Sequence, residues 1–457
     1  MKKTSQLTLP VNFDGELPDL LDQMVEESGD VNWTEAIAQI EAELAQLDPA
    51  ASPREWASVQ FGLLMAYRMA PPGEIAGGLQ RSIERGLEAL SVLTESGSPT
   101  EWAALQTNLA AAYLESGTED EAAFVQAIEH FRCALRVFSK GKCPNEWALI
   151  QKGLALAYTG SPGENPGANL RRALQCYEVA LGVFTRKKDP ESWAECHRGM
   201  GEIYQILPDG KPAMNFRKGV DHLGNALQVY TPDKYPEEWF EVKMSLAVAY
   251  FESEFESAKT GLKKTLRHCE EMLAVLTESK NPEQWALVHM TLGHFYEASV
   301  LAATNADIET IFPRIIEHFE AATRVLTETE SPEHWADAQR GLGSAWANSG
   351  VGDRAANLKR AITHFEAAGR VYTETSYPFE WAQNRTHLAV AYRNLPDGDL
   401  EAQEEKAVAL AEESLRVFTE EEYPEEWEFL QDFLDESGPD DWLLDDDFDE
   451  SDPFAED

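Results

Sequence analysis

The chain has 457 residues, of which 43% are apolar and 26% charged, and its formal net charge at neutral pH is −43. No stretch approaches the 18 consecutive apolar residues that a membrane-spanning helix needs, so we expect no transmembrane span and no membrane partner. The acidic excess also argues against direct binding of nucleic acid, because phosphates require a basic stripe.

Residues 1–50 carry eleven acids against Lys2 and Lys3, and they contain no apolar run of the kind that begins a secretory signal. Helical patterns at Leu17–Val25 and Trp33–Leu47 predict an N-terminal helical cap over 1–50. The five cysteines are odd in number and form no Cys-x-x-Cys pair, which favours reduced thiols in a cytoplasmic protein.

From residue 51 onward the dominant feature is a tryptophan register with a spacing of 45, 46 or, once, 50 residues. Self-similarity at a period of this size predicts a stacked repeat protein. The nine register tryptophans are Trp56, Trp102, Trp147, Trp193, Trp239, Trp285, Trp335, Trp381 and Trp427.

Each register tryptophan begins the same helical pattern, in which Leu or Met follows seven residues later. An aromatic residue follows eleven residues later in every copy but that of Trp427. Offsets of 0, 7 and 11 lie on one face of a helix, so we expect these residues in the core. A proline three residues before each tryptophan predicts the first helical position. At Ser52 and Ser98, a Glu three residues later predicts a capping box.

A second helix follows each first helix after a variable loop, and Ala361-x-x-x-Phe365-x-x-Ala368 is a plain copy. The unit is thus a helical hairpin, which must stack on neighbours to bury its apolar faces. Five histidines share one position of the second helix. Because neighbouring helices lie about 8–10 Å apart, we expect histidines of adjacent repeats to be too far apart to share a metal ion. We attribute the shared position to repeat inheritance or to a pH-sensitive stripe of histidines. They are His130, His222, His268, His318 and His364.

The motifs Leu342-Gly343-x-x-Trp346 and Ala361-x-x-x-Phe365-x-x-Ala368 resemble the tetratricopeptide repeat (TPR), and the chain looks like the long TPR-like repeats of bacterial multidomain proteins. The register tryptophan lies one turn before the family's own Trp position, and the unit is about twelve residues longer than the family's. The resemblance implies an all-α superhelix of stacked hairpins, an α-solenoid. It says little about function, because such arrays serve many systems.

We therefore predict a cap over 1–50, eight hairpins over 51–419, a capping helix over 420–436 and an acidic tail over 437–457. From Glu420 to Asp457 there are nineteen Asp or Glu residues and no Lys or Arg. Within this tail, apolar side chains alternate with the acids. They are Trp442, Leu443, Leu444, Phe448 and Phe454.

If the TPR geometry holds, the positions five, nine and twelve residues after each register tryptophan line a concave groove. Flexible Met side chains and isolated cations there would suit a peptide with some acidic character. The alternative is that these residues pack against neighbouring repeats. The candidate groove residues are Phe61, Met65, Arg68, Leu114, Lys152, Leu156, Arg198, Met244, Phe251, Met290, His294, Arg340 and Arg393.

The tail is either a disordered solubiliser or a segment that binds a basic, apolar-pitted partner surface. In a third interpretation it docks into the protein's own groove near Lys152, Arg198 and Arg340 and blocks it.

We find no nucleotide-binding, hydrolase or metalloprotease motif, so we expect no enzyme, cofactor or small-molecule ligand. The first functional hypothesis is a scaffold that binds a protein or peptide in the groove. The alternatives are an acidic antagonist that mimics nucleic acid and blocks a basic protein, and the sensor half of a system whose effector is encoded separately.

Overall fold

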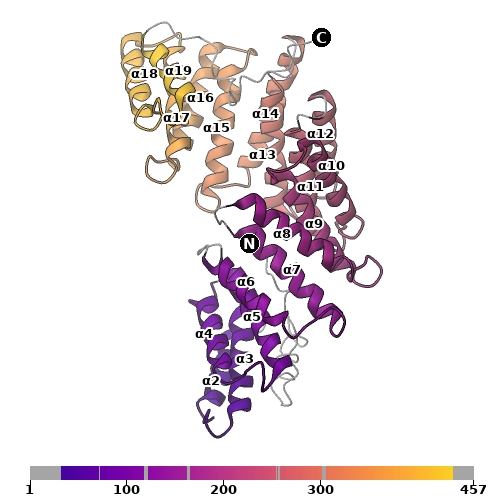
Figure 1. Cartoon of the computed structure of the whole chain (residues 1–457). Coiled ribbons are helices and arrows are strands. Elements are labelled where there is room, and N and C mark those ends of the chain that lie inside the picture. The colour runs from indigo at the N-terminus through magenta and orange to yellow at the C-terminus, as the bar shows by residue number, and fades with distance from the viewer. Residues whose placement is uncertain are drawn as a thin grey trace. The chain divides into compact units, whose positions relative to one another are not determined.

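The computed structural model describes residues 32–71, 73–117, 122–161, 165–253, 255, 258–300 and 305–435. These residues form helices and turns, without a strand, and consecutive helices pack side by side in pairs (Figure 1). The chain divides at Lys234 into two units. Each unit is a stack of helical hairpins, which confirms the predicted all-α solenoid architecture.

In the described part of the first unit, the helix α2, Trp33–Leu44, precedes four hairpins and packs on the first of them. The hairpins are α3 (Pro53–Met69) with α4 (Gly78–Leu90), α5 (Pro99–Ser116) with α6 (Ala122–Ala134), α7 (Pro144–Gly160) with α8 (Pro166–Ala180), and α9 (Pro190–Ile206) with α10 (Pro212–Ala226).

The described part of the second unit also has four hairpins, which the helix α19, Pro424–Leu434, follows. The 50-residue interval of the register falls at its second hairpin, whose helices have 18 and 19 residues. The hairpins are α11 (Pro236–Phe251) with α12 (Ala258–Leu273), α13 (Pro282–Ser299) with α14 (Asn305–Thr323), α15 (Pro332–Asn348) with α16 (Arg354–Ala368), and α17 (Pro378–Arg393) with α18 (Leu400–Ser414). The predicted helix at Leu17–Val25 and the tail at 437–457 lie outside the described residues.

The helix starts follow the sequence, but their capping does not. Each first helix begins at the predicted proline. The capping boxes are wrong, because neither Ser52 nor Ser98 makes a side-chain cap hydrogen bond. In a capping box the Glu101 side chain would accept a hydrogen bond from the amide of Ser98, but this amide already donates to the Thr94 carbonyl at 2.9 Å. The hydroxyl of Thr94 accepts a hydrogen bond from the Gly97 amide at 3.1 Å. Two backbone amides of the turn before α5 are therefore satisfied by Thr94 rather than by a capping box.

The core of each hairpin contains the Leu or Met seven residues after the register tryptophan. Each of these side chains, from Leu63 to Leu388, is buried. Glycine makes room for the second helix in several hairpins: a Cβ on Gly343 would lie 2.4 Å from the ring of Phe365. The close approach of α15 and α16 therefore requires a residue without a side chain at this position.

The register tryptophans are less buried than the sequence predicts. Trp239 and Trp381 are core residues, at 7% and 5% exposure. The remaining seven are half-buried, and cations cover several of them: the Arg370 guanidinium lies 5.2 Å from the ring centre of Trp335. Arg370 also pairs with Glu328 of the preceding junction at 2.8 Å. Two tryptophans are therefore fully in the core. Most of the half-buried rings pack against the edge of the core, and four of them also lie under a cation.

Candidate functional site

The first helices of neighbouring hairpins touch one another in both units, as α3 does α5 and as α11 does α13. The positions five, nine and twelve residues after the register tryptophan lie along this row of helices. We call the surface that they form the first-helix face. Its character differs from hairpin to hairpin, and it decides which predicted groove residues can meet a partner.

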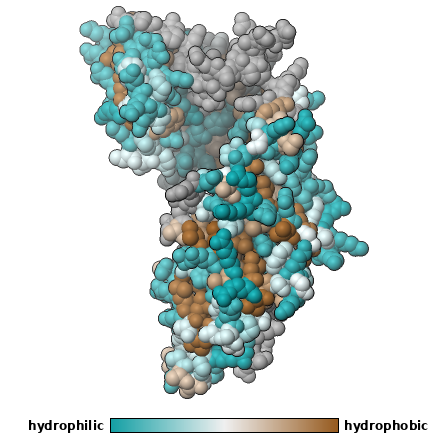
Figure 2. Space-filling view, in the orientation of Figure 1, coloured by the Kyte–Doolittle hydropathy of each residue, from teal (hydrophilic) through white to brown (hydrophobic). Residues whose placement is uncertain are grey.

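In the first unit this face is largely closed by packing. Phe61, Met65 and Leu114 are 6–7% exposed and belong to the continuous core of the unit. Lys152 is 2% exposed and Arg68 is 8% exposed. These five predicted groove residues are packing positions, as the alternative interpretation held. Figure 2 shows apolar surface on the first unit interleaved with hydrophilic side chains.

The cations of the first-helix face are not isolated, which corrects one basis of the groove hypothesis. Arg68 on α3 contacts Glu115 on α5 at 2.9 Å and donates to the Asn108 side chain at 3.3 Å. Lys152 on α7 forms an ion pair with Glu195 on α9. Each pair joins the first helices of adjacent hairpins, so these charges stabilise the stack.

Two further predicted cations are also paired with acids, but within one helix or one hairpin. Arg198 contacts Glu202 one turn along α9, at 3.1 Å. Arg393 forms an ion pair with Glu404 and donates to the Phe433 carbonyl of α19. Because their charges are already compensated, these side chains give the face no general preference for an acidic peptide.

The second unit exposes more apolar surface on this face. Met244 and Phe251 of α11 and Met290 of α13 are half-buried rather than buried, and α11 touches α13 directly. The Phe251 ring lies 4.4 Å from that of Phe295, which fixes its orientation. We call Met244, Phe251 and Met290 the α11–α13 patch. Leu156 of α7 is half-buried as well, but its neighbours in the first unit are mostly closed.

A charged cluster lies beside this patch, between α13 and α15. His294 Nε2 is 2.9 Å from Asp337 Oδ2, and its Nδ1 is 3.6 Å from Glu297 Oε2. Arg340 contacts the other oxygen of Asp337 at 3.1 Å. Burial alone would lower the pKa of His294, but interaction of the ring N–H groups with the Asp337 and Glu297 carboxylates outweighs burial and raises the pKa to about 9. His294 is therefore a cation at neutral pH.

The carboxyl of Asp337 responds in the opposite direction. Burial favours its neutral form, but His294 and Arg340 hold the pKa of Asp337 well below its usual range. The cluster thus contains charges of both signs that compensate one another. It can orient a polar group of a ligand beside the apolar patch without presenting a net charge.

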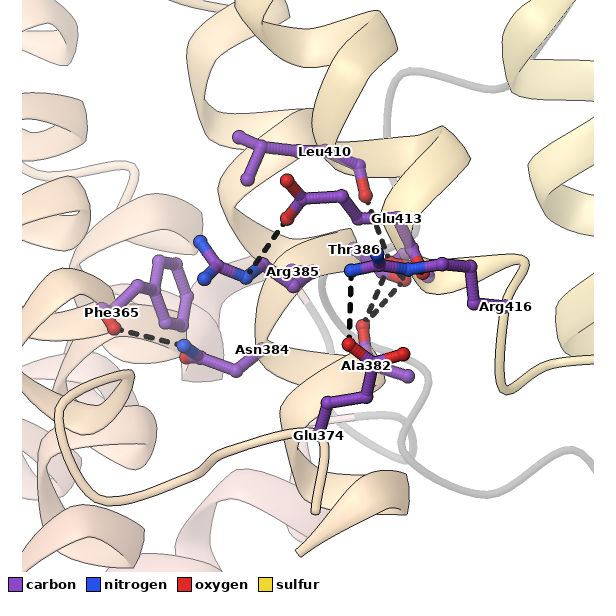
Figure 3. A network of polar contacts seen from close by, with 10 residues as sticks. Phe365, Glu374, Ala382, Asn384, Arg385, Thr386, Leu410, Glu413 and Arg416 are labelled. Atoms are coloured by element: carbon purple, nitrogen blue, oxygen red, sulfur yellow. Dashed lines mark hydrogen bonds and ion pairs between the residues drawn. The ribbon is translucent and has the colours of Figure 1, made fainter.

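The last hairpin shows how completely the face can close (Figure 3). Thr386, five residues after Trp381, is 1% exposed and donates to the Ser414 hydroxyl of α18 at 3.1 Å. Ser414 in turn donates to the Ala382 carbonyl at 3.0 Å. The Asn384 amide donates to the Phe365 carbonyl of α16 at 2.9 Å, which connects this hairpin to the preceding one. The Thr386 side chain therefore offers almost no surface to a partner.

Sequence reasoning missed the acids that compensate these cations. Glu195 and Asp337 stand two residues after their register tryptophans, a position at which Glu241 is also an acid and the other hairpins carry Ser, Ala, Leu or Gln. An acid at this position, together with a cation five or nine residues after the tryptophan of the preceding repeat, could have predicted these ion pairs. Sequence reasoning also gave no role to His197 and His289, each of which lies against a histidine of the second helix, at 2.8 Å.

Within the described ranges, no cluster of three or more His, Cys, Asp or Glu side chains could hold a metal ion. None of the helices described is both long and apolar enough to cross a membrane. The predicted tail contacts, Trp442 to Phe454, lie outside the described residues.

In comparisons with known proteins, no family model matches this chain and no curated protein matches it in sequence.

Proposed function

We infer that the protein is a non-enzymatic, cytoplasmic interaction scaffold of the long-repeat TPR-like kind, and that it binds a protein or peptide at the α11–α13 patch. The TPR-like motif supports this: Gly343 and Phe365 pack together as a Leu-Gly pattern facing an Ala-x-x-x-Phe pattern requires. The five free cysteines agree with a reducing compartment. The proposal includes no cofactor and no small-molecule substrate.

The exposure of Met244, Phe251 and Met290 is the observation that carries this proposal. Phe61, which in α3 holds the position of Met244 and Met290, is buried, whereas the three side chains of the patch keep part of their surface in water. Met side chains adapt to apolar partners of several shapes. Because the neighbouring charges compensate each other, the partner that fits is an amphipathic segment that buries apolar anchors on the patch.

The proposal is tested by affinity capture from the native cytoplasm, with Met244→Glu and Met290→Glu in one variant. Met214→Glu is the matched control, since Met214 is 53% exposed on α10, in the first unit. A partner retained by the wild type and by the control, and weakened at least about tenfold in the double variant, supports the patch. Equal capture by all three proteins rejects it.

A second candidate function is an acidic antagonist that occupies the basic site of a nucleic-acid-binding protein. The exposed side chains of Glu425, Glu428 and Asp432 favour it, because they place acid along α19, just before the acidic tail. Its affinity should fall steeply between 0.1 and 1 M salt, as the Debye length shrinks from about 10 to about 3 Å. Binding at the apolar patch should change little over that range.

The tail enters both candidates, either as a second contact or as a self-inhibitory segment. Removing residues 437–457 should weaken the antagonist strongly, whereas a self-inhibitory tail predicts tighter partner binding after removal. A separately encoded effector as the partner would make the scaffold a sensor subunit, and identification of the captured protein decides this.

A further inference from the structure

Two hairpins contain a pair of imidazoles between their helices. His197 of α9 lies with Nδ1 2.8 Å from Nδ1 of His222 on α10. His289 of α13 and His318 of α14 repeat the arrangement, again at 2.8 Å. The first-helix histidine stands four residues after the register tryptophan in both hairpins. One hairpin lies in each unit, so the same geometry occurs twice.

Aromatic rings enclose each pair on both sides. In α9 and α10, the Trp193 ring lies 4.3 Å from His197 and the Tyr204 ring stacks on His222 at 5.7 Å. In α13 and α14, the corresponding distances are 4.2 Å from Trp285 to His289 and 5.5 Å from Tyr296 to His318. These rings replace water around the imidazoles, so charge on the pair is poorly hydrated.

Few charged groups act on the pairs. Asp221 and Lys218, both on α10, act on His222 with opposite sign. Around the second pair, Arg314 and Glu317 of α14 act on His318. Arg324, after α14, and Glu278, before α13, act on His289. Asp221, Glu317 and Glu278 each favour an imidazolium, but a nearby cation opposes each of them, so burial decides the direction of the pKa shifts.

A hydrogen bond between two Nδ1 atoms needs one donor and one acceptor, so at least one ring must be neutral. Protonating both removes the acceptor and brings two cations together. Burial, helped by the neighbouring imidazole, lowers the pKa of His197 and that of His289 to about 4. Opening the hairpin frees the rings to protonate near their ordinary pKa of about 6.5. Stability is therefore lost as pH falls from 6.5 toward 4.

Other hairpins carry fewer imidazoles at this place. Gln106 meets His130 on α5 and α6 at 2.5 Å, and Gln339 meets His364 on α15 and α16 at 2.7 Å. Gln60 of α3 meets Glu88 instead, with no imidazole. The chain thus contains an internal series of two, one or no imidazoles between the helices of a hairpin.

We propose that the two imidazole pairs are acid-sensitive contacts, so that mild acidification opens the α9/α10 and α13/α14 hairpins before the others. Opening of α13 and α14 would displace Met290 and His294 and so change the first-helix face. The inference does not rest on the proposed function, because it concerns the free protein and is tested without a partner.

Hydrogen exchange of the full chain at pH 7 and pH 5, corrected for the intrinsic rates, tests the proposal. One imidazole whose pKa rises from about 4 to about 6.5 on opening increases the opening constant about 20-fold between these pH values. We expect exchange to increase most in α9/α10 and α13/α14, less in α5/α6 and α15/α16, and least in α3/α4.

Two reciprocal substitutions make the test specific. His197→Gln creates the Gln–His pair found in α5/α6. It should reduce, by a factor of about 20, the increase in the opening constant of α9/α10 between pH 7 and pH 5. Gln339→His creates a second imidazole in α15/α16 and should add acid sensitivity there. Both pairings already occur in this fold, so both variants should fold. An acid response that ignores the number of imidazoles, or that survives His197→Gln unchanged, overturns the proposal.

Discussion

The same repeat position is core in the first unit and surface in the second. Phe61 of α3 and Met244 of α11 both stand five residues after a register tryptophan, yet Phe61 is 7% exposed and Met244 is only half-buried. The next first helix differs: two residues after its register tryptophan α5 has Ala104, where α13 has the larger Leu287. Helix spacing depends on the side chains at the contact, so the neighbouring repeat decides whether a position is available to a partner.

The largest expected effect comes from placing a carboxylate at these two positions. Phe61→Glu buries an unpaired charge and should lower the free energy of unfolding by about 4–5 kcal/mol. Met244→Glu can hydrate its carboxylate and should cost less than about 1 kcal/mol. Urea denaturation followed by circular dichroism measures both. Equal losses in the two variants would mean that the α11–α13 patch is core.

A second comparison concerns the register tryptophans. Trp239→Ala removes a ring that is 7% exposed and should cost about 3–4 kcal/mol. Trp102→Ala removes a half-buried ring under Arg136, whose guanidinium is 5.8 Å away, and should cost about half as much. Thermal or urea unfolding gives the two values, and a larger loss for Trp102→Ala would contradict the observed burial.

The ion pair between α7 and α9 allows a test of the stack in the first unit. Lys152→Ala leaves Glu195 without its cation, and because the Glu195 side chain is 23% exposed we expect a loss of about 2 kcal/mol rather than the larger loss of a fully buried pair. The double variant Lys152→Ala with Glu195→Ala should recover part of it. A double-mutant cycle measures the coupling, and a coupling near zero would show that the pair does not stabilise the stack.

The smallest expected effect is the pH dependence that His294 contributes to the second unit. Its pKa of about 9 in the folded chain exceeds the ordinary value of 6.5, so its contribution is complete below pH 6.5 and is lost as pH rises through 9. We expect His294 to contribute about 1 kcal/mol to the free energy of unfolding, since its side chain is 31% exposed and solvent screens its charge. In His294→Gln this alkaline loss should disappear from pH-dependent unfolding curves. Its persistence would assign the loss to another group.

Much of the fold could be predicted from periodicity. The prolines predicted where first helices begin, and the Leu and Met positions predicted the core, because a helix of period 3.6 places offsets of 0, 7 and 11 on one face. The capping boxes failed because the amide of Ser98 already donates to Thr94 in the junction turn. A local motif cannot reveal that one of its hydrogen-bonding groups is already used.

The candidate site was harder to predict. Position along a helix indicated correctly that Met290 and His294 share one face of α13. It did not reveal that Arg68 and Lys152 compensate acids on the next hairpin, or that His197 lies against His222. The ion-pair partners of Arg68 and Lys152 are 47 and 43 residues away and meet them only because hairpins stack, whereas the two imidazoles are 25 residues apart and meet because α9 packs on α10.

The amino-acid sequence by itself determined the hairpin, its helix starts and the leucines of its core, because these depend on interactions within one repeat. Burial of the first-helix face, the compensation of its cations and the imidazole pairs were decided by tertiary structure. The physical reason is that each depends on the distance between two helices and on the side chain that the facing helix presents, and neither quantity is local in the chain.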